Sequence, residues 1–209
     1  MQLDVSTRLD AINFIIGSIG LAPVEAEDAY NLDVAQASQL IDAVSRDIQN
    51  NRGGGFWFNR EKNWKLSPDP VTGTISVPNV ALSIYRFNEY NQQQKIATRG
   101  RQLYDTEEHG FDMRPLVNSD GYVRLMIITQ LDFEDLPQTA KWAITTMAAV
   151  KFASRVEMDM NRVQVLGQEA QDAMWSLESE ETSQANVNAF KVNGTLAQFN
   201  ANAGGFNNW

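Results

Sequence analysis

The chain has 209 residues, with 17 basic and 26 acidic side chains, one His and no Cys, and its formal net charge is −9 at pH 7. The absence of Cys excludes a disulfide framework, Cys-ligated zinc and a thiol nucleophile, and a single His excludes a multi-His metal site. The acidic balance argues against a protein that coats DNA, and no apolar run approaches the roughly 20 residues that span a bilayer, so we expect no membrane insertion.

Two amphipathic helices are predicted in residues 1–52. The first follows Thr7, which fits a capping box with Asp10. The second follows Asn31, a favourable N-cap residue, and ends at the glycine run 53–55, because three glycines cost too much backbone entropy inside a helix. We expect this run to form a flexible turn and not a phosphate-binding loop, since it lacks the Lys-Ser/Thr of a P-loop.

Residues 53–134 carry the signals of a β-rich domain. Short runs of strand-forming residues alternate with turns that contain Gly and Pro, and the last run is long and apolar enough for a central strand. This spacing predicts a small antiparallel sandwich or a barrel-like domain. The predicted strands are 56–58, 64–66, 75–77, 82–84, 103–104 and 122–131.

Helical spacing returns after Pro137, in residues 135–181, and predicts a third helix and then a fourth that begins near Asn161. At the end of the fourth helix the sequence predicts an exposed acidic run of Glu178, Glu180 and Glu181. The inward positions are Ala140, Ile144, Met147, Val150 and Ser154 in the third helix, and Val163, Leu166, Ala170, Ala173 and Leu177 in the fourth.

The segment 182–209 is rich in Asn and Gly and lacks the composition to hold itself folded. Large apolar residues are nevertheless spaced along it, which a purely solvating tail would rarely keep. We expect an extended C-terminal arm that becomes ordered on a partner subunit. The alternative is an arm that folds back over its own domain. The candidate anchors are Phe190, Leu196, Phe199, Phe206 and Trp209.

Charge is unevenly distributed along the chain. The net charge is −6 in residues 1–50, +4 in 51–105 and −7 in 106–209. Acidic ends around a basic middle predict two structural units, unless the clustering is a chance property of a solvated surface. We therefore predict an α+β fold, in which the helices of both chain ends come together as one unit and the β-rich domain is inserted between them.

No constellation of residues predicts an active site, a cofactor site or a metal site, and we expect the protein not to be an enzyme. The loop with Asp105, Glu107 and Glu108 lacks calcium-loop spacing. Glu134 and Asp135 are adjacent carboxylates beside apolar residues, and glycoside hydrolysis uses a pair of carboxylates. A polysaccharide-degrading enzyme acting on the host surface is therefore kept as an alternative, although sequence neighbours seldom converge on one substrate.

The basic middle segment leaves a second alternative, because cations interleaved with aromatic residues can bind nucleic acid. The same residues can instead form a sheet core with a basic rim that faces an acidic partner. We favour the rim, since the whole chain repels phosphates at long range. The aromatic residues are Phe56, Trp57, Trp64 and Tyr85, and the basic ones are Arg52, Arg60, Lys62, Lys65, Arg86, Lys95, Arg99 and Arg101.

A series of short landmarks runs in order through residues 11–137. They are Ala11-Ile12-Asn13, Ile19 to Val24, a helix that carries Gln49, Phe56-Trp57-Phe58-Asn59, Leu66 to Asp69, Thr74 to Asn79, Leu103-Tyr104-Asp105 and Leu131 to Pro137. Each landmark alone is weak, but the ordered set resembles the tail tubular protein A family of short-tailed bacteriophages. One departure is the run of three glycines before Phe56-Trp57, where relatives tend to have a single Gly.

The resemblance implies a four-helix bundle that carries a β-rich domain and a homo-oligomeric ring, expected to contain twelve copies. Such a ring lies between the portal protein and the tail nozzle made by tail tubular protein B, with tail fibres near the junction. Double-stranded DNA passes through its channel without specific binding. The location implied is the virion tail, after synthesis in the host cytoplasm. The resemblance carries over no catalytic residue. The candidate contacts on the nozzle or fibre side are Arg60, Lys62, Lys65, Arg99 and Arg101.

Overall fold

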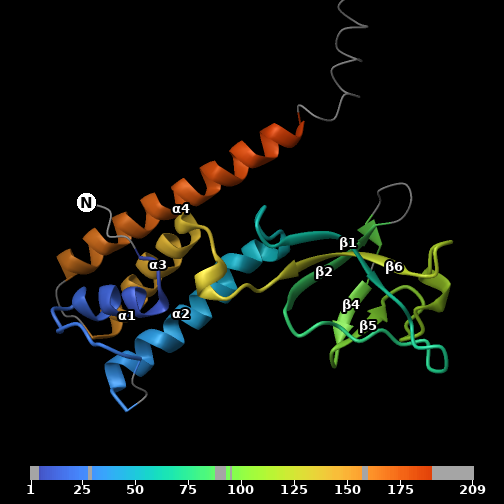
Figure 1. Ribbon diagram of the computed structural model, residues 1–209, viewed down its shortest axis with the longest axis horizontal. Helices are drawn as coiled ribbons and strands as arrows, with labels where there is room; N and C mark the ends of the chain where they lie inside the picture. Colours follow the sequence, from blue (N-terminus) through green and yellow to red (C-terminus); the bar gives the residue numbers. More distant parts are fainter. Residues whose placement is uncertain (1–4, 28–29, 88–92, 95, 157–159, 190–209) are drawn as a thin grey trace, which may run out of the picture.

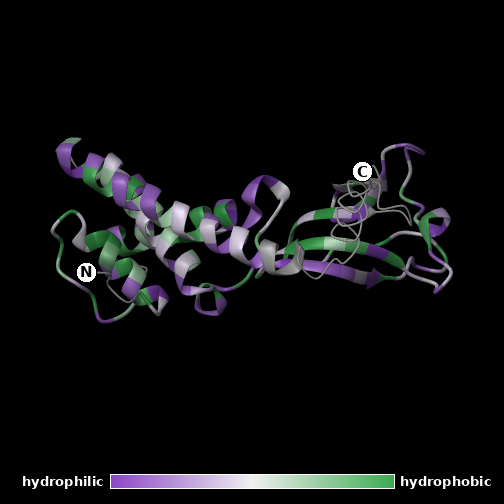
Figure 2. Cartoon of the chain, turned by 90° about the horizontal axis from the view of Figure 1, so that it is seen from above, coloured by the Kyte–Doolittle hydropathy of each residue, from purple (hydrophilic) through white to green (hydrophobic). Residues whose placement is uncertain are grey.

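The computed structural model describes residues 5–27, 30–87, 93–94, 96–156 and 160–189. Within these ranges the fold is α+β, as predicted, and a helical half and a β half lie end to end along the long axis (Figure 1). Figure 2 shows the same arrangement from above. The helices are α1 (Arg8–Gly17), α2 (Leu32–Asn50), α3 (Gln138–Val156) and α4 (Met160–Ala189).

Both N-caps in the first half of the chain are confirmed. The hydroxyl of Thr7 accepts from the backbone N–H of Asp10 at 3.1 Å, and the Asp10 carboxylate accepts from the N–H of Thr7 at 2.8 Å. These bonds complete the capping box of α1. The side chain of Asn31 accepts from the backbone N–H groups of Asp33 and Val34 at the start of α2.

Helix α3 lies at the centre of the helical half and packs against α1, α2 and α4. It is therefore buried over more than one stripe, and Trp142, Ala143 and Phe152 are all less than 9% exposed. The predicted inward face of α3 is wrong at Ser154, which is exposed, whereas that of α4 is largely confirmed. Helix α4 packs chiefly on α3, so the four-helix bundle is confirmed only in part and stays open between α1 and α4.

Strands β1, β6, β2 and β3 form an antiparallel sheet in that order, so the strand predicted to be central, β6, does lie inside the sheet. Strands β4 and β5 form a separate hairpin. The strands of the described residues do not close into a barrel, and the barrel-like alternative is wrong for them. Their bounds are β1 (Arg60–Leu66), β2 (Ala81–Phe87), β3 (Gln93–Gln94), β4 (Ile96–Arg99), β5 (Gln102–Asp105) and β6 (Val123–Thr129).

Two predicted strands differ from the structure. The segment 56–58 is irregular, because its aromatic residues pack into the helical core instead of pairing with a strand. Residues 75–77 contribute only one β-bridge, from Ser76 to Gln102, although Ile75 and Val77 are buried.

Two hydrophobic cores are present among the described residues. One joins residues of all four helices with Phe56, Phe133 and Leu136 from the connecting segments. Both ends of the chain therefore share one core, as predicted. The other core lies within the β half, where Ile75, Leu103, Met113, Val123, Leu125 and Ile127 meet.

The C-terminal segment begins later than predicted. Helix α4 continues to Ala189, so residues 182–189 are helical and not an extended arm. The proposed anchors Phe190, Leu196, Phe199, Phe206 and Trp209 lie outside the described residues and stay predictions.

Candidate assembly surfaces and the joint between the two halves

A buried polar joint connects the helical half to the β half. Gln49, in the last turn of α2, is 0% exposed. Its side-chain amide donates to the carbonyl of Leu131 at 2.9 Å, and its side-chain oxygen accepts from the N–H of Leu131 at 2.8 Å. This reciprocal pair fixes the end of α2 against the chain that leaves β6.

Asn59 completes the joint directly before β1, and it too is 0% exposed. Its amide donates to the carbonyls of Gln49 and Thr129, both at 2.9 Å, and its oxygen accepts from the N–H of Phe56 at 2.8 Å. A buried amide with its groups bonded in this way favours one arrangement of its neighbours, because each lost bond leaves a desolvated polar atom. We infer that the joint holds the two halves in one relative orientation.

The glycine run beside the joint forms the predicted turn, and the turn is closely packed at Gly53 and Gly55. Gly53 has φ +92° and Gly55 has φ +59°, a region that favours glycine. A Cβ on Gly55 would lie 2.7 Å from a methyl group of Ile128, and a Cβ on Gly53 would collide with the Tyr85 hydroxyl. The run therefore lets the backbone pass directly over β6 and β2.

The acidic run at the end of α4 contacts the joint instead of lying in solvent. Glu181 accepts from the backbone N–H of Trp57 at 2.7 Å and pairs with the guanidinium of Arg60 at 3.0 Å. Glu180 accepts from the hydroxyl of Thr139 in α3 at 2.6 Å. The prediction of an exposed run is thus wrong for Glu180 and Glu181, and only Glu178 is exposed.

The residues proposed for the nozzle or fibre side do not form one patch. Arg60 is bound to Glu181 and also donates to two glycine carbonyls. Lys62 and Lys65 are exposed on β1, and Lys65 lies 3.5 Å from Asp120. The other two cations belong to the β4–β5 hairpin, where Arg99 stacks 3.6 Å over the ring of Tyr104 and Arg101 is exposed.

The remaining cations and aromatic residues of the basic middle do not support a nucleic-acid platform. Phe56 and Phe58 stack on each other with ring centroids 5.6 Å apart and pack in the helical core. Their rings are therefore not available to stack on a nucleic-acid base. Arg86 is buried, and its burial lowers its pKa despite the charge of Asp105. Lys95 lies outside the described residues.

Two of the acidic residues considered for chemistry, Glu134 and Asp105, have structural partners. Glu134 accepts from the backbone N–H of Arg8 at 3.2 Å, at the positive end of the α1 dipole. Asp135 is exposed. Asp105 is turned inward and accepts from the N–H groups of Glu107 and Glu108. Over the described ranges no cluster of three or more potential metal ligands occurs, and no helix there is long and apolar enough to cross a bilayer.

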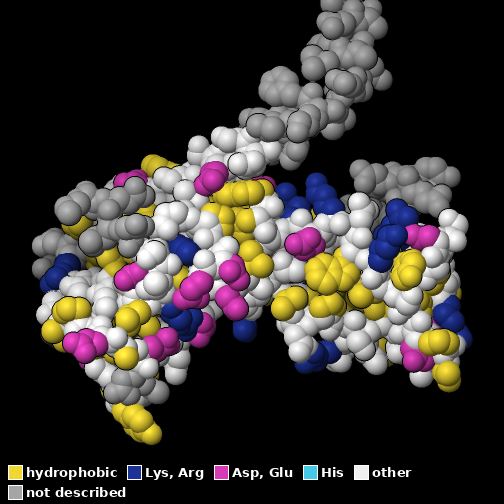
Figure 3. Space-filling view, viewed as in Figure 1, with side chains coloured by type: hydrophobic (Ala, Val, Ile, Leu, Met, Phe, Trp, Pro, Cys, Tyr) yellow, Lys and Arg dark blue, Asp and Glu magenta, His cyan; other side chains and the backbone are white. Residues whose placement is uncertain are grey.

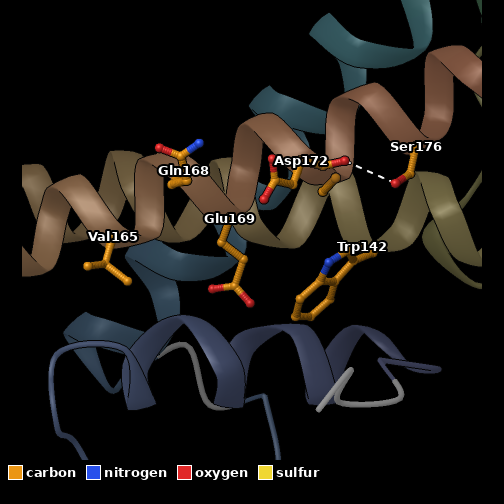
Figure 4. A pocket seen from close by; sticks show the side chains of 7 residues that line it. Trp142, Val165, Gln168, Glu169, Asp172 and Ser176 are labelled. Carbon is orange, nitrogen blue, oxygen red and sulfur yellow. Dashed lines mark hydrogen bonds between the residues drawn. The ribbon is translucent and has the colours of Figure 1, made fainter.

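An open groove of about 490 Å³ lies where the bundle is incomplete, between α4 and α1. Figure 4 shows Trp142 and Glu169 pointing toward α1. The indole of Trp142 meets the ring of Phe14 edge-on at 5.1 Å and forms the floor. The groove is lined by Trp142, Val165, Gln168, Glu169, Asp172, Ala173 and Ser176.

Helix α4 also exposes two large apolar side chains, one in the lining of this groove and one next to it. Val165 is 68% exposed and Trp175 is 58% exposed. The residues of this surface were missed by sequence reasoning, because helical spacing identifies a buried stripe and not its open flank. The available signal was Trp175, a large aromatic residue of α4 that lies outside the predicted inward positions.

Residues 9–187 match a family model described as tail tubular protein. The chain is 29% identical over 155 residues to tail tubular protein A of Klebsiella phage KP34, a match that covers 74% of this chain and 76% of that protein.

Proposed function

The chain belongs to the tail tubular protein family, and on that premise we propose that it forms a ring-shaped adaptor between the portal and the tail nozzle of a short-tailed phage. Membership makes the protein a structural component of the phage tail and not an enzyme. The proposed ring has twelve copies, surrounds a channel for genome ejection, and receives tail fibres near the nozzle. It is made in the host cytoplasm.

The open flank of the helical half is the observation that best supports assembly. The groove between α1 and α4 and the adjacent Trp175 leave apolar surface uncovered in the single chain. Patches of this kind mark sites of protein contact, and Trp is enriched among the residues that dominate binding. In a ring, such a surface is covered by a different surface of the neighbouring copy. Repeating that contact around one rotation axis closes the ring.

The charge of the chain supports DNA transit without binding. The net charge is −9, and in Figure 3 acidic side chains gather over the helical half. A negatively charged channel wall repels the DNA phosphates. It also displaces no counterions from the duplex, so the release that usually stabilises protein–DNA binding does not occur. The basic side chains are therefore proposed to face protein partners.

We propose two domains and an arm for this role. The helical domain comprises residues 1–52 and 135–189, the β-rich domain 53–134, and the arm 190–209, and the two hydrophobic cores support the division into two domains. The arm residues Phe190, Leu196, Phe199, Phe206 and Trp209 are proposed to contact the portal or a neighbouring copy. Lys62, Lys65, Arg99 and Arg101 are proposed to face the nozzle or fibres. Arg60 would take part only by sharing its guanidinium with Glu181.

Negative-stain images of the purified chain, alone and with portal protein, test the proposal. We expect rings, either spontaneously or after portal is added. A chain that stays monomeric and never binds portal contradicts the adaptor. Release of reducing sugar that is lost in Glu134→Gln or Asp135→Asn would favour the polysaccharide-degrading enzyme, and salt-dependent DNA affinity would favour the nucleic-acid-binding module.

A further inference from the structure

We propose that the groove between α1 and α4 receives the segment Phe190-Lys191-Val192 of a second copy of this chain. The inference rests on the proposed ring and names the contact that closes it. The groove supplies one side of the contact, and the residues that directly follow α4 of the next copy supply the other.

The chemistry of the groove matches this segment. Trp142 and Ala173 are 8% and 3% exposed and give the groove an apolar floor. Glu169 and Asp172 add two carboxylates, and neither has an ion-pair partner among the described residues. An apolar floor with unpaired negative charge beside it suits a segment that presents both apolar groups and one cation.

The segment that follows α4 has that pattern. In an extended chain, alternate side chains point to opposite sides, so Phe190 and Val192 would face one way and Lys191 the other. Lys191 is the only charged side chain in residues 190–209. The apolar pair would contact the floor, where the ring of Phe190 meets the indole of Trp142. Lys191 starts on the opposite side, and its flexible four-carbon stem would reach back to Glu169 or Asp172.

A chain cannot place this segment in its own groove. Helix α4 continues from Ser176, at the end of the groove, to Ala189, which at 1.5 Å per residue is about 20 Å. The two residues from Ala189 to Lys191 span at most about 7 Å when fully extended. If this segment fills the groove, it must therefore come from another copy, and the contact joins two different surfaces, as a closed ring requires.

Cysteine cross-linking tests the contact in the full chain, which has no native Cys. One copy carries Ser176→Cys and a second, of different mass, carries Val192→Cys; the two are mixed and assembled with portal before mild oxidation. We expect disulfide-linked pairs that contain one copy of each mass. Gln171→Cys, exposed on α4 but not lining the groove, is the matched control and should cross-link at least tenfold less.

The outcomes separate the possible occupants. Cross-linking of Ser176→Cys to Ala203→Cys in place of Val192→Cys, or a link inside one chain, would show that the distal arm fills the groove and would overturn the proposal. If rings form normally but Ser176→Cys cross-links to neither Val192→Cys nor Ala203→Cys, the proposed contact is overturned, whereas the proposed adaptor function is not. A wild-type chain that never forms rings contradicts the adaptor itself and the contact with it.

A charge exchange tests the ion pair without relying on one variant that fails to fold. Glu169→Lys and Lys191→Glu should each weaken assembly at least tenfold, whereas the double variant Glu169→Lys/Lys191→Glu should recover most of it. Circular dichroism verifies that each variant is folded. A double variant no better than the weaker single one, while Asp172→Lys/Lys191→Glu also fails to recover, would overturn the pairing.

Discussion

Asn59 donates from its side-chain amide to the backbone carbonyl of Gln49 over 2.9 Å, and both residues are fully buried. The bond links the last turn of α2 to the residue before β1, where the helical half ends and the β half begins. Both positions belong to the landmarks that predicted the family. Their value as landmarks has a physical basis, because they hold the joint between the two halves.

Replacing Asn59 by Ala should lower the free energy of unfolding by about 3 kcal/mol or more. The change leaves the carbonyls of Gln49 and Thr129 and the N–H of Phe56 buried without this partner, and each such loss costs about 1–3 kcal/mol, not fully additively. Urea unfolding measures the effect. Asn79→Ala, at an exposed position, is the control and should stay within about 0.5 kcal/mol of wild type.

Gly55→Ala should destabilise the chain by about 2 kcal/mol or more, whereas Gly54→Ala should be tolerated. At Gly55 the backbone has φ +59° and the new Cβ would lie 2.7 Å from Ile128, so strain and overpacking add. At Gly54 the nearest atom is 3.5 Å away and φ is not positive. Thermal unfolding of the two variants checks this; equal melting temperatures would contradict the packed turn.

Glu181→Ala should reduce the free energy of unfolding by about 1–2 kcal/mol. It removes a partly exposed ion pair, worth up to about 1 kcal/mol, and the acceptor of the Trp57 N–H. Glu178→Ala on the same helix removes an exposed carboxylate and should have little effect. Hydrogen exchange should also show faster exchange at Trp57 in Glu181→Ala, and unchanged protection there would argue against the contact.

The stabilisation contributed by Asp10 should depend on pH. Hydrogen bonds from Thr7, through its hydroxyl and its backbone N–H, hold the pKa of Asp10 below its usual value of 3.8. Because the folded pKa is lowered, the contribution is complete above the unfolded pKa and is lost as pH falls through the folded one. Asp10→Ala should therefore cost about 1 kcal/mol at pH 7 and progressively less below about pH 4.

Urea unfolding between pH 2.5 and 7 measures this difference. Asp47→Ala, which removes an exposed carboxylate from α2, corrects for the general effect of losing one acidic side chain. A difference between wild type and Asp10→Ala that stays constant down to pH 2.5 would show that the capping box acts without its charge.

Trp175→Ser should leave the single chain stable but impair ring formation. The side chain is 58% exposed on α4, so its loss opens no cavity, and the free energy of unfolding should change by less than about 0.5 kcal/mol. Mass photometry with portal present should show rings reduced at least tenfold. Val71→Ser, at a position 85% exposed in the β half, should assemble normally. Equal assembly of the two variants would place the ring contact elsewhere.

Much of the fold follows from local sequence. Thr7 and Asn31 begin their helices because each satisfies backbone N–H groups a few residues away. The apolar run 122–131 contains the inner strand β6, since period and composition are properties of a short window. The charge division also anticipated that both chain ends share one core.

The contacts that local sequence does not predict join residues far apart in the chain. Glu181 bonds to Trp57 across 124 residues, and Gln49 bonds to Leu131 across 82. From the sequence alone, the acidic run 178–181 is predicted to lie in solvent and the aromatic run 56–58 to form a strand. Both predictions fail because each run packs against a surface that is distant in the sequence. The open flank beside Trp142 likewise depends on how α4 crosses α3. Local pattern and composition predict the helices, most of the strands and the family, whereas long-range packing sets which polar groups are buried together and which apolar surface stays free, because burial depends on both surfaces at once.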